Sequence, residues 1–226
     1  MNKNHKTQKV IIYGDSDFAE QVYYQLETDG RYKILAFTVD ESKFEKNTFI
    51  GLPVIPFQQL SNHYSTNEVQ IFPAIGYSKL NTIREIVTTE IEQAGYKLFT
   101  YISKKAHVSI NAEIGYGCYI CEFVSIGSNS KIGKSTIILP HASIAHDVNI
   151  SSFSFLSHST IIGGYTSIKK NTFFGLGSIV KNNITVDEFN IIGAASNVLK
   201  STEPNGIYIG NPAKRLKDVD INNLNF

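Results

Sequence analysis

The chain is poor in sulfur and has no tryptophan. Its 226 residues include one methionine and two cysteines. Cys118 and Cys121 form a lone C-x-x-C pair, whereas a zinc site normally needs a second pair of ligands and a redox C-x-x-C opens a helix. We therefore expect two ordinary thiols and no bound metal.

An excess of charge of either sign is also missing. The chain carries 21 Lys and Arg against 20 Asp and Glu, a formal net charge of +1. Proteins that bind nucleic acid or an anionic membrane concentrate positive charge. The balance argues against both partners and favours a small molecule.

Long hydrophobic runs are absent from the start of the chain. The segment MNKNHKTQKVIIYG is polar and then passes through a short apolar run. That run is shorter than the hydrophobic region of a signal peptide or a membrane span. We expect a cytoplasmic protein.

The first part of the chain has the pattern of an α/β domain. From residue 9 to about residue 101, short β-branched runs alternate with longer amphipathic stretches, which is typical of strands and intervening helices. Strands are expected at residues 10–13, 33–40 and 69–76, and helices at about 16–29 and 79–94. Residues 49–60 read as a short excursion before a helix. We predict a Rossmann-like domain over residues 1–100, built on a small parallel sheet.

Beyond residue 101 a period of six replaces the helical pattern. Stepping by six from Ile102 to Val198 meets seventeen residues, and all are apolar. Only 42% of the chain is hydrophobic, so a run of this length does not arise by chance. The positions, here called pivots, are Ile102, Val108, Ile114, Ile120, Ile126, Ile132, Ile138, Ile144, Ile150, Leu156, Ile162, Ile168, Phe174, Val180, Val186, Ile192 and Val198.

A strict hexad predicts a three-sided prism over residues 101–226. One inward residue recurs on each side, three hexads complete a coil, and the pivots stack into a continuous core. The phase never breaks, so no long loop leaves any coil. Small residues often follow the pivot, where a bulky Cβ would clash with the turning backbone. These are Gly115, Gly127, Gly133, Ala145, Gly163, Gly175 and Gly193.

With this repeat, the sequence resembles the hexapeptide-repeat acyltransferases, whose coils form a left-handed parallel β-helix. More narrowly it resembles the sialic acid O-acetyltransferases and the bacillosamine-pathway N-acetyltransferases. Their small Rossmann-like domain, β-helix and G-x-P-A-K tail correspond here to residues 9–217, with the tail at residues 210–214. The resemblance implies an acetyl-CoA-dependent N-acyltransferase acting on a nucleotide-linked amino sugar in surface-glycan biosynthesis. It also implies a homotrimer with active sites between adjacent prisms.

Histidine is the side chain that titrates near neutral pH without help, so it is the first candidate for a general base. His146 lies two residues past the pivot Ile144 and precedes Asp147. This pair matches the family's histidine–acid motif, and the resemblance implies that His146 is the base and Asp147 sets its orientation or charge. Without the motif, His146 would read as a hydrogen-bonded surface residue.

Two further histidines are candidates for the site. His158 also lies two residues past a pivot, but twelve residues separate it from His146, which places it two sides further round the prism. We expect it to contact substrate only if sites form between subunits, and otherwise to be a polar interface residue. His141 follows Pro140, and its part in the site stays open.

Small residues suggest where the acyl donor binds. The resemblance implies that Gly164 supplies the amide that stabilises the oxyanion, and the alternative is a tight corner of the β-helix. The residues expected to line a groove for coenzyme A come from successive coils, joined by one lysine of the tail, although small residues also simply let coils turn. They are Gly175, Gly177, Gly193, Ala194, Ala195 and Lys214.

The turn after the first expected strand is a degenerate dinucleotide-binding motif. Gly14, Asp15 and Ser16 follow the strand, but Ser16 and Ala19 stand where the later glycines of G-x-G-x-x-G would be, which argues against a dehydrogenase. By resemblance this turn and Asp40, after the second expected strand, hold the nucleotide-linked sugar. An ordinary strand-to-helix turn is the alternative.

Three other functions stay open. A sugar O-acetyltransferase of the sialic acid type would use the same site, and the sequence fixes neither the acceptor atom, the sugar, the nucleotide nor the acyl group. A non-catalytic β-helix scaffold would have lost the chemistry. Nicotinamide-dependent redox chemistry would require the N-terminal domain to bind the cofactor.

Overall fold

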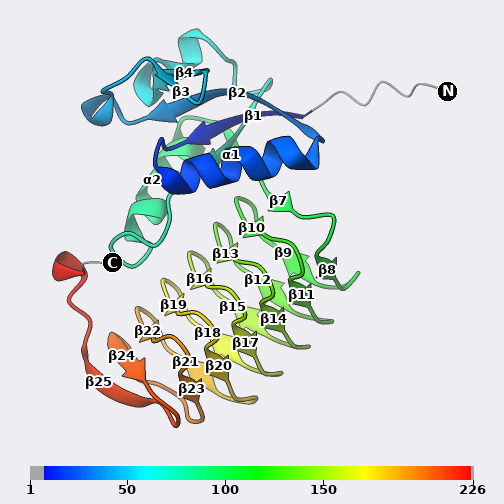
Figure 1. Ribbon diagram of the computed structural model, residues 1–226, viewed down its shortest axis with the longest axis vertical. Helices are drawn as coiled ribbons and strands as arrows, with labels where there is room; N and C mark the ends of the chain where they lie inside the picture. The colour runs from blue at the N-terminus through cyan, green and yellow to red at the C-terminus, as the bar shows by residue number, and fades with distance from the viewer. Residues whose placement is uncertain (1–7, 225–226) are drawn as a thin grey trace. The chain divides into compact units, whose positions relative to one another are not determined.

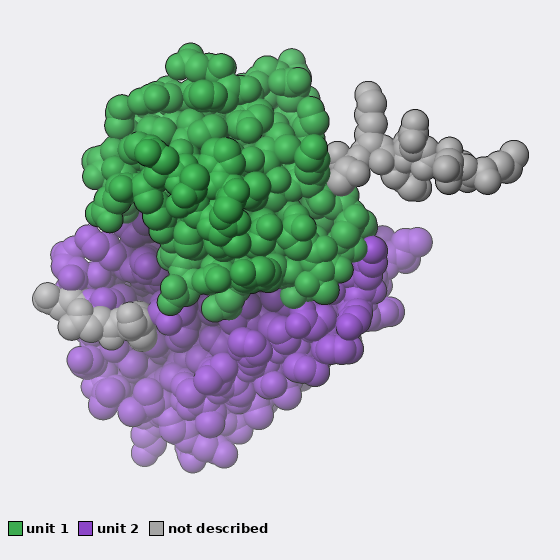
Figure 2. All heavy atoms as spheres, turned by 45° about the horizontal axis from the view of Figure 1, so that its top comes forward, with its two compact units in different colours: residues 1–75, 87–99 green, residues 76–86, 100–226 purple. Residues whose placement is uncertain are grey.

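The computed structural model describes residues 8–224 (Figure 1). The chain divides into two compact units, residues 1–75 with 87–99 and residues 76–86 with 100–226 (Figure 2). Residues 76–86 thus belong to the second unit, although the sequence pattern assigns them to the first domain. Within residues 8–224, no helix combines the length and the hydrophobicity needed to cross a membrane.

The first unit is built on a six-stranded sheet in the order β3-β4-β2-β1-β5-β6. All neighbours are parallel except the β3–β4 hairpin. The strands are β1 (Gln8–Tyr13), β2 (Tyr32–Val39), β3 (Thr48–Phe49), β4 (Leu52–Pro56), β5 (Gln70–Pro73) and β6 (Lys97–Leu98). The helical segments are α1 (Asp17–Asp29), η1 (Glu41–Lys43), η2 (Phe57–Asn62) and α2 (Thr82–Gln93), of which α2 belongs to the first unit only from residue 87 onward.

The predicted α/β domain is confirmed, with one boundary displaced. Residues 10–13, 33–40 and 69–76 contain strands of the parallel sheet, whose central β1 residues Ile11 and Ile12 are fully buried. The second long helix begins at Thr82 instead of residue 79. Lys79, Leu80 and Asn81 have positive φ angles, a conformation that a right-handed helix cannot accommodate.

The second unit is a left-handed β-helix, as the hexad predicts. Each pivot ends a two-residue strand, and strands eighteen residues apart pair in parallel, as Ile126 does with Ile144 and Ile144 with Ile162. The strands are β7 (Tyr101–Ile102), β8 (His107–Val108), β9 (Glu113–Ile114), β10 (Tyr119–Ile120), β11 (Ser125–Ile126), β12 (Lys131–Ile132), β13 (Ile137–Ile138), β14 (Ser143–Ile144), β15 (Asn149–Ile150), β16 (Phe155–Leu156), β17 (Ile161–Ile162), β18 (Ser167–Ile168), β19 (Phe173–Phe174), β20 (Ile179–Val180), β21 (Thr185–Val186), β22 (Ile191–Ile192) and β23 (Asn197–Val198).

The sides of the prism are three parallel sheets, named here by their first strands. The β7 sheet contains β10, β13, β16, β19 and β22, the β8 sheet contains β11, β14, β17, β20 and β23, and the β9 sheet contains β12, β15, β18 and β21. From Ile120 onward every pivot is buried. The pivots therefore form the continuous core that the sequence predicts.

Coil stacking explains the small residues after the pivots. A Cβ added at Gly133 would lie 2.3 Å from the backbone nitrogen of Ser152, and one added at Gly163 would lie 2.5 Å from that of Asn182. Both contacts are with the next coil, and both are shorter than real Cβ contacts. The predicted steric reason for these glycines is therefore correct.

Residues 76–86 are tied to the β-helix by a buried arginine. Arg84 is fully buried, and its guanidinium donates to the backbone oxygens of Ser135 at 2.9 Å and of Phe153 and Ser154 at 3.2 Å. Desolvation lowers the pKa of Arg84 to about 9. These bonds to coil corners hold this segment in the second unit.

The last coil is closed by the tail. β24 (Gly206–Ile209) extends the β7 sheet in parallel, and β25 (Lys214–Asp218) returns antiparallel to it. The G-x-P-A-K residues 210–214 make the connection, and the amide of Ala213 donates to the oxygen of Asn197 at 2.8 Å. A short helix, η3 (Ile221–Asn223), follows.

The three sides of the prism differ in their outward side chains. On the β7 sheet, Phe155 and Phe173 are covered by Tyr77, with ring centroids 5.1 and 5.0 Å away. The β8 sheet presents Ile161 and Ile179, which are 45% and 40% exposed. The outward residues of the β9 sheet are polar, namely Glu113, Lys131, Asn149, Ser167 and Thr185. Among the two-residue strands of the prism, the exposed apolar side chains therefore lie on the β8 sheet.

Candidate active site

His146 and Asp147 lie in the turn between β14 and β15, at the corner between the β8 and β9 sheets. The imidazole Nδ1 is 2.8 Å from Asp147 Oδ2. His146 is exposed and Asp147 is half-buried. Asp147 adopts a left-handed φ of 56°, which Asp tolerates better than most residues, and its amide donates to the oxygen of Ser128 at 2.8 Å.

The surroundings of Asp147 favour its ionised form. The hydrogen bond to His146 is the largest cause that lowers its pKa, and Asn129 adds a bond from Nδ2 to Oδ1 at 3.2 Å. An ionised carboxylate only accepts hydrogen bonds, so the proton in the His146–Asp147 contact belongs to Nδ1. The neutral ring then leaves the lone pair of Nε2 free, as a general base requires.

Gly164 lies eighteen residues after His146, in the adjacent coil. A Cβ at Gly164 would be 3.2 Å from both Cε1 and Nε2 of His146, so the glycine leaves room for the ring. Within residues 8–224 its amide has no hydrogen-bond acceptor. The same is true of Ser128, His146 and Asn182 at the equivalent turn positions, but only Gly164 leaves that amide without a side chain beside it.

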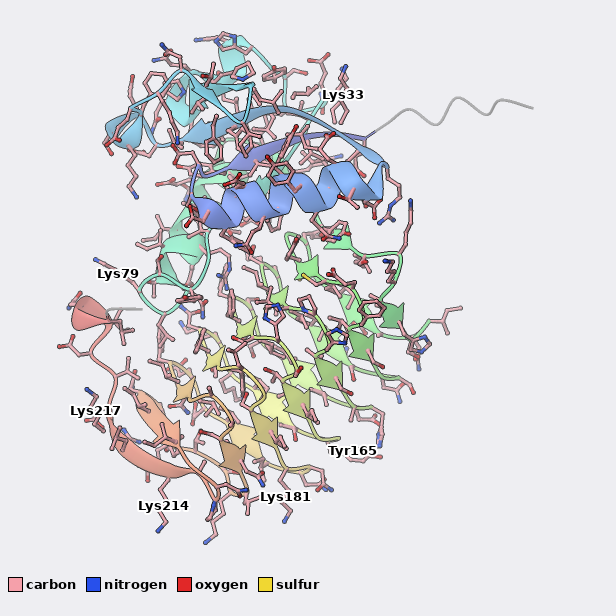
Figure 3. All side chains as sticks on the ribbon, viewed as in Figure 1. Lys33, Lys79, Tyr165, Lys181, Lys214 and Lys217 are labelled. Carbon is pink, nitrogen blue, oxygen red and sulfur yellow. The ribbon has the colours of Figure 1, made fainter. Side chains whose placement is uncertain are left out.

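Two residues at this corner escaped the sequence analysis. Tyr165, which Figure 3 labels, is 61% exposed, and its ring lies 5.1 Å from the His146 ring at 87°. Asn129 holds the far oxygen of Asp147. Both stand eighteen residues from Asp147, and this coil spacing is the signal that would have found them.

The other candidate histidines lie at a different corner. His141 and His158 occupy turns between the β7 and β8 sheets, and His141 stacks on Phe123 with ring centroids 5.0 Å apart. His158 is exposed, and its carbonyl accepts from the amide of Gly177 at 2.9 Å. Within one chain, His158 lies away from His146, as the twelve-residue spacing predicts, and His141 lies at the same corner as His158.

The small residues expected to contact coenzyme A line the same corner as His158. A Cβ at Gly175 would lie 2.5 Å from the nitrogen of Ala194, and one at Gly193 would lie 2.8 Å from Ile209 Cγ2. Coil packing therefore accounts for both glycines. Gly177 has a φ of 63° with nothing within 4 Å of a Cβ. Ala194 and Ala195 are exposed, and so is Lys214 on the final hairpin (Figure 3).

In the first unit, the predicted nucleotide-sugar residues follow two neighbouring parallel strands. Gly14 follows β1 with a φ of 124°, and a Cβ there would be 3.0 Å from the oxygen of Ala74. Asp15 forms an ion pair with Lys46 at 3.1 Å. Ser16 is the N-cap of α1, but its side chain makes no capping hydrogen bond.

Asp40 follows β2 and caps η1. Its carboxylate accepts from the Ser42 amide at 2.9 Å, from Gln58 Nε2 at 2.8 Å and from the Ser42 hydroxyl. The bonds from Ser42 and Gln58 lower the pKa of Asp40. Asp40 therefore stabilises the turn after β2, in addition to any role in binding substrate.

The two cysteines are interior thiols. Both are free and buried, and desolvation raises the pKa of Cys118 to about 12 and that of Cys121 further still. Within residues 8–224, no group of three or more His, Cys, Asp or Glu side chains is arranged to hold a metal ion.

Comparisons with known proteins match both units. A model of the PglD N-terminal domain family matches residues 9–91. PerB from Caulobacter crescentus, solved with CoA and GDP-perosamine, superposes with a TM-score of 0.83 at 25% identity, over 92% of this chain and 97% of that chain. Residues 9–91 therefore belong to the PglD N-terminal domain family, and the chain shares the fold of PerB.

Other similar proteins agree with these matches. The acetyltransferase domain of PglB from Neisseria gonorrhoeae FA1090, solved with acetyl coenzyme A, has a TM-score of 0.81 at 25% identity, over 93% of this chain and 100% of that chain. GDP-perosamine N-acetyltransferase from Escherichia coli O157:H7 is 30% identical over 141 residues. That alignment spans 60% of this chain and 63% of the Escherichia coli protein.

Proposed function

We propose that this protein transfers an acetyl group from acetyl-CoA to the amine of a nucleotide-linked amino sugar. One observation carries the proposal, namely that Asp147 holds Nδ1 of His146 while Nε2 lies against the glycine backbone of Gly164. Two similar proteins support an amine acceptor, because the Escherichia coli protein is a GDP-perosamine N-acetyltransferase and Caulobacter PerB was solved with GDP-perosamine. The PglB domain supports acetyl-CoA as the donor.

The site residues divide the reaction between them. The sugar amine attacks the thioester carbonyl in its neutral form, Nε2 of His146 takes a proton from the attacking nitrogen as the C–N bond forms, and Asp147 stabilises the resulting imidazolium. The carbonyl electrons move onto oxygen, where the Gly164 amide donates a hydrogen bond. As the C–S bond breaks, coenzyme A leaves as thiolate and takes the proton from His146. The products are the acetamido sugar and free coenzyme A, with no covalent enzyme intermediate.

The donor fits the corner that His158 shares with the small residues. Gly177, Ala194 and Ala195 expose little side-chain bulk, so an extended pantetheine arm can run along successive coils. Lys214 offers a cation for the phosphates. Gly175 and Gly193 contribute to this groove indirectly, because they allow the coils that form it to pack closely.

The nucleotide-linked sugar is assigned to the first unit together with His158. The Ser16 hydroxyl caps nothing, the Gly14 backbone has no side chain in the way, and Asp15 and Asp40 are carboxylates able to accept from ribose or base groups. His158 is assigned to the sugar end. This assignment requires another copy of the chain, because His158 and His146 lie at different corners of one prism.

A homotrimer supplies that copy. The exposed Ile161 and Ile179 make the β8 sheet the side suited to burial, whereas the β9 sheet is polar. Exposed apolar area of this kind marks interaction surfaces. A neighbour packed there would bring the His158 corner of one chain toward the His146 corner of the next, completing a site between subunits.

The test is a substrate panel. Purified protein is mixed with acetyl-CoA and nucleotide-linked sugars that offer either an amine or only hydroxyls, and release of free thiol is followed. We expect turnover with an amino sugar, and the product mass should rise by one acetyl group. Turnover only with hydroxyl sugars would replace the proposal with O-acetylation, and acetyl-CoA binding without turnover on any sugar would favour a scaffold.

A further inference from the structure

A line of amide side chains ends at the His146–Asp147 pair. Asn111, Asn129 and Asp147 are spaced by eighteen residues, so they stack at one corner of successive coils. Asn111 Nδ2 donates to Asn129 Oδ1 at 2.6 Å, and Asn129 Nδ2 donates to Asp147 Oδ1 at 3.2 Å. We name this line the amide ladder. It consists of Asn111 and Asn129, together with Ser109, whose hydroxyl donates to Asn111.

The amide ladder has a fixed direction. Asn111 Oδ1 accepts from the Ser109 hydroxyl at 2.9 Å and from the Asn129 backbone amide at 3.4 Å. The Asn129 backbone amide can only donate, so the Asn111 atom that faces it must be Oδ1, and Asn111 Nδ2 then points at Asn129 Oδ1. Asn129 Oδ1 is then occupied, and its Nδ2 must face Asp147. The ladder therefore presents N–H donors, and no acceptor, to the carboxylate.

The backbone supports this stacking. Asn129 and Asp147 both have left-handed φ angles, 58° and 56°, which Asn and Asp tolerate with little strain. Their side chains leave equivalent turn positions and meet directly. Asp147 bonds Asn129 through Oδ1 and His146 through Oδ2. Because both oxygens belong to one planar carboxylate, the bond from Asn129 also sets the orientation in which Oδ2 meets the imidazole.

We propose that Asn129 is a positioning residue for the reaction, holding Asp147 so that the imidazole of His146 keeps its proton on Nδ1 and its Nε2 lone pair toward Gly164. The effect on catalysis rests on the proposed function, whereas the orientation of Asp147 and His146 does not. Asp147 is part-exposed, so without Asn129 its carboxylate can turn toward water. The imidazole would then lose the partner that selects its tautomer.

The geometric part is tested without turnover. Long-range ¹H–¹⁵N NMR spectra distinguish the two neutral tautomers of histidine, and the His146 signals are assigned by their loss in His146→Gln. In the unsubstituted protein, at a pH where the ring is neutral, we expect the Nδ1–H tautomer to predominate. A predominant Nε2–H tautomer would overturn the proposal, and this measurement requires no ladder variant to fold.

Substitutions then test the role of Asn129. Asn129→Asp keeps the shape and the left-handed preference but replaces the donor with a second carboxylate, and Asn129→Ser removes the amide. Both should shift the tautomer ratio toward Nε2–H. The matched control is Asn183→Asp, because Asn183 occupies the same turn position with a φ of 58° but does not bond Asp147. It should leave the ratio unchanged.

Kinetics separates this proposal from the proposed function. Both Asn129 variants should lower kcat about tenfold, with the KM for acetyl-CoA unchanged, since only the orientation of the base is altered. Loss of acetyl transfer in His146→Ala, with normal tautomer ratio and kcat in both Asn129 variants, would overturn the positioning role and leave the proposed function standing. A shifted ratio in a protein that acetylates no amino sugar would support the geometry and remove the proposed function.

Discussion

The imidazole of His146 lies directly against the backbone of Gly164, one coil away. A Cβ on Gly164 would be 3.2 Å from two ring atoms, whereas a Cβ on the neighbouring Gly163 would be 2.5 Å from the backbone nitrogen of Asn182. The two adjacent glycines therefore leave room for different neighbours. Gly163 accommodates the next coil, and Gly164 accommodates the candidate base.

This difference predicts opposite effects of two alanine substitutions. Gly164→Ala should displace the imidazole by a few tenths of an ångström and lower kcat about 10- to 100-fold, with a small change in thermal stability. Gly163→Ala should destabilise the fold by about 1–3 kcal/mol, because backbone atoms cannot move aside as a side chain can. Thermal unfolding and steady-state kinetics of both variants measure this. Equal stability losses would contradict the assignment.

Removal of the base should affect the chemical step. His146→Ala should lower kcat by about 10²-fold or more, the range of a lost general base, with little change in the KM for acetyl-CoA. The residual rate should rise with pH for an amine acceptor, since a deprotonated amine attacks unaided. His63→Ala, a substitution of an exposed histidine in the first unit, is the control. Turnover of His146→Ala at the unsubstituted rate near neutral pH would remove the base assignment.

The β8 sheet should be the subunit interface. We expect light scattering at micromolar concentration to give the mass of three chains. Ile161→Lys with Ile179→Lys places charges on the exposed apolar side and should yield monomers that have lost activity, because the site needs two copies. Asn149→Lys, on the outward side of the polar β9 sheet, should remain trimeric. A monomeric unsubstituted protein would contradict the shared site.

The pivots should be sensitive to volume. Ile150 is fully buried, and Ile150→Ala should lower the free energy of unfolding by about 2–5 kcal/mol, as expected for a buried large-to-small change. Ile110, in a turn of the same β-helix, is fully exposed, so Ile110→Ala should change it by less than about 0.5 kcal/mol. Chemical denaturation of both variants checks the difference.

The cysteines should not react in the folded protein. Burial raises the pKa of Cys118 to about 12, so almost no thiolate forms at about pH 8, and the thiolate is the reactive species. We expect no reaction of either cysteine with the thiol reagent DTNB until the protein is denatured, when two thiols per chain should react. Fast reaction of native protein would place a cysteine at the surface. The expected result also means that thiol-release assays report coenzyme A alone.

The sequence by itself determined the β-helix. An unbroken hexad of apolar residues, sustained from Ile102 to Val198, specifies which side chain points inward at every sixth position of successive coils. The glycines that follow the pivots were predictable for the same reason, since they lie where the next coil must pass. The sequence pattern predicts that α2 begins at residue 79, three residues before its start at Thr82, because the left-handed turn at residues 79–81 leaves no periodic signal.

The candidate site was only partly accessible to sequence. Because His146 and Asp147 are adjacent in sequence, a histidine–acid pair was predictable. The twelve-residue spacing between His146 and His158 likewise predicted that His158 lies on another side of the prism. Tertiary structure decided the rest. Stacking of coils brings Asn129, Asp147 and Tyr165 together although eighteen residues separate each from the next, and it distinguishes Gly164 from Gly163. The coil spacing of eighteen residues identifies which side chains occupy adjacent turns. Whether they touch depends on the direction in which each turn projects its side chain, and this direction is set by the local φ and the neighbouring coils, which periodicity does not encode.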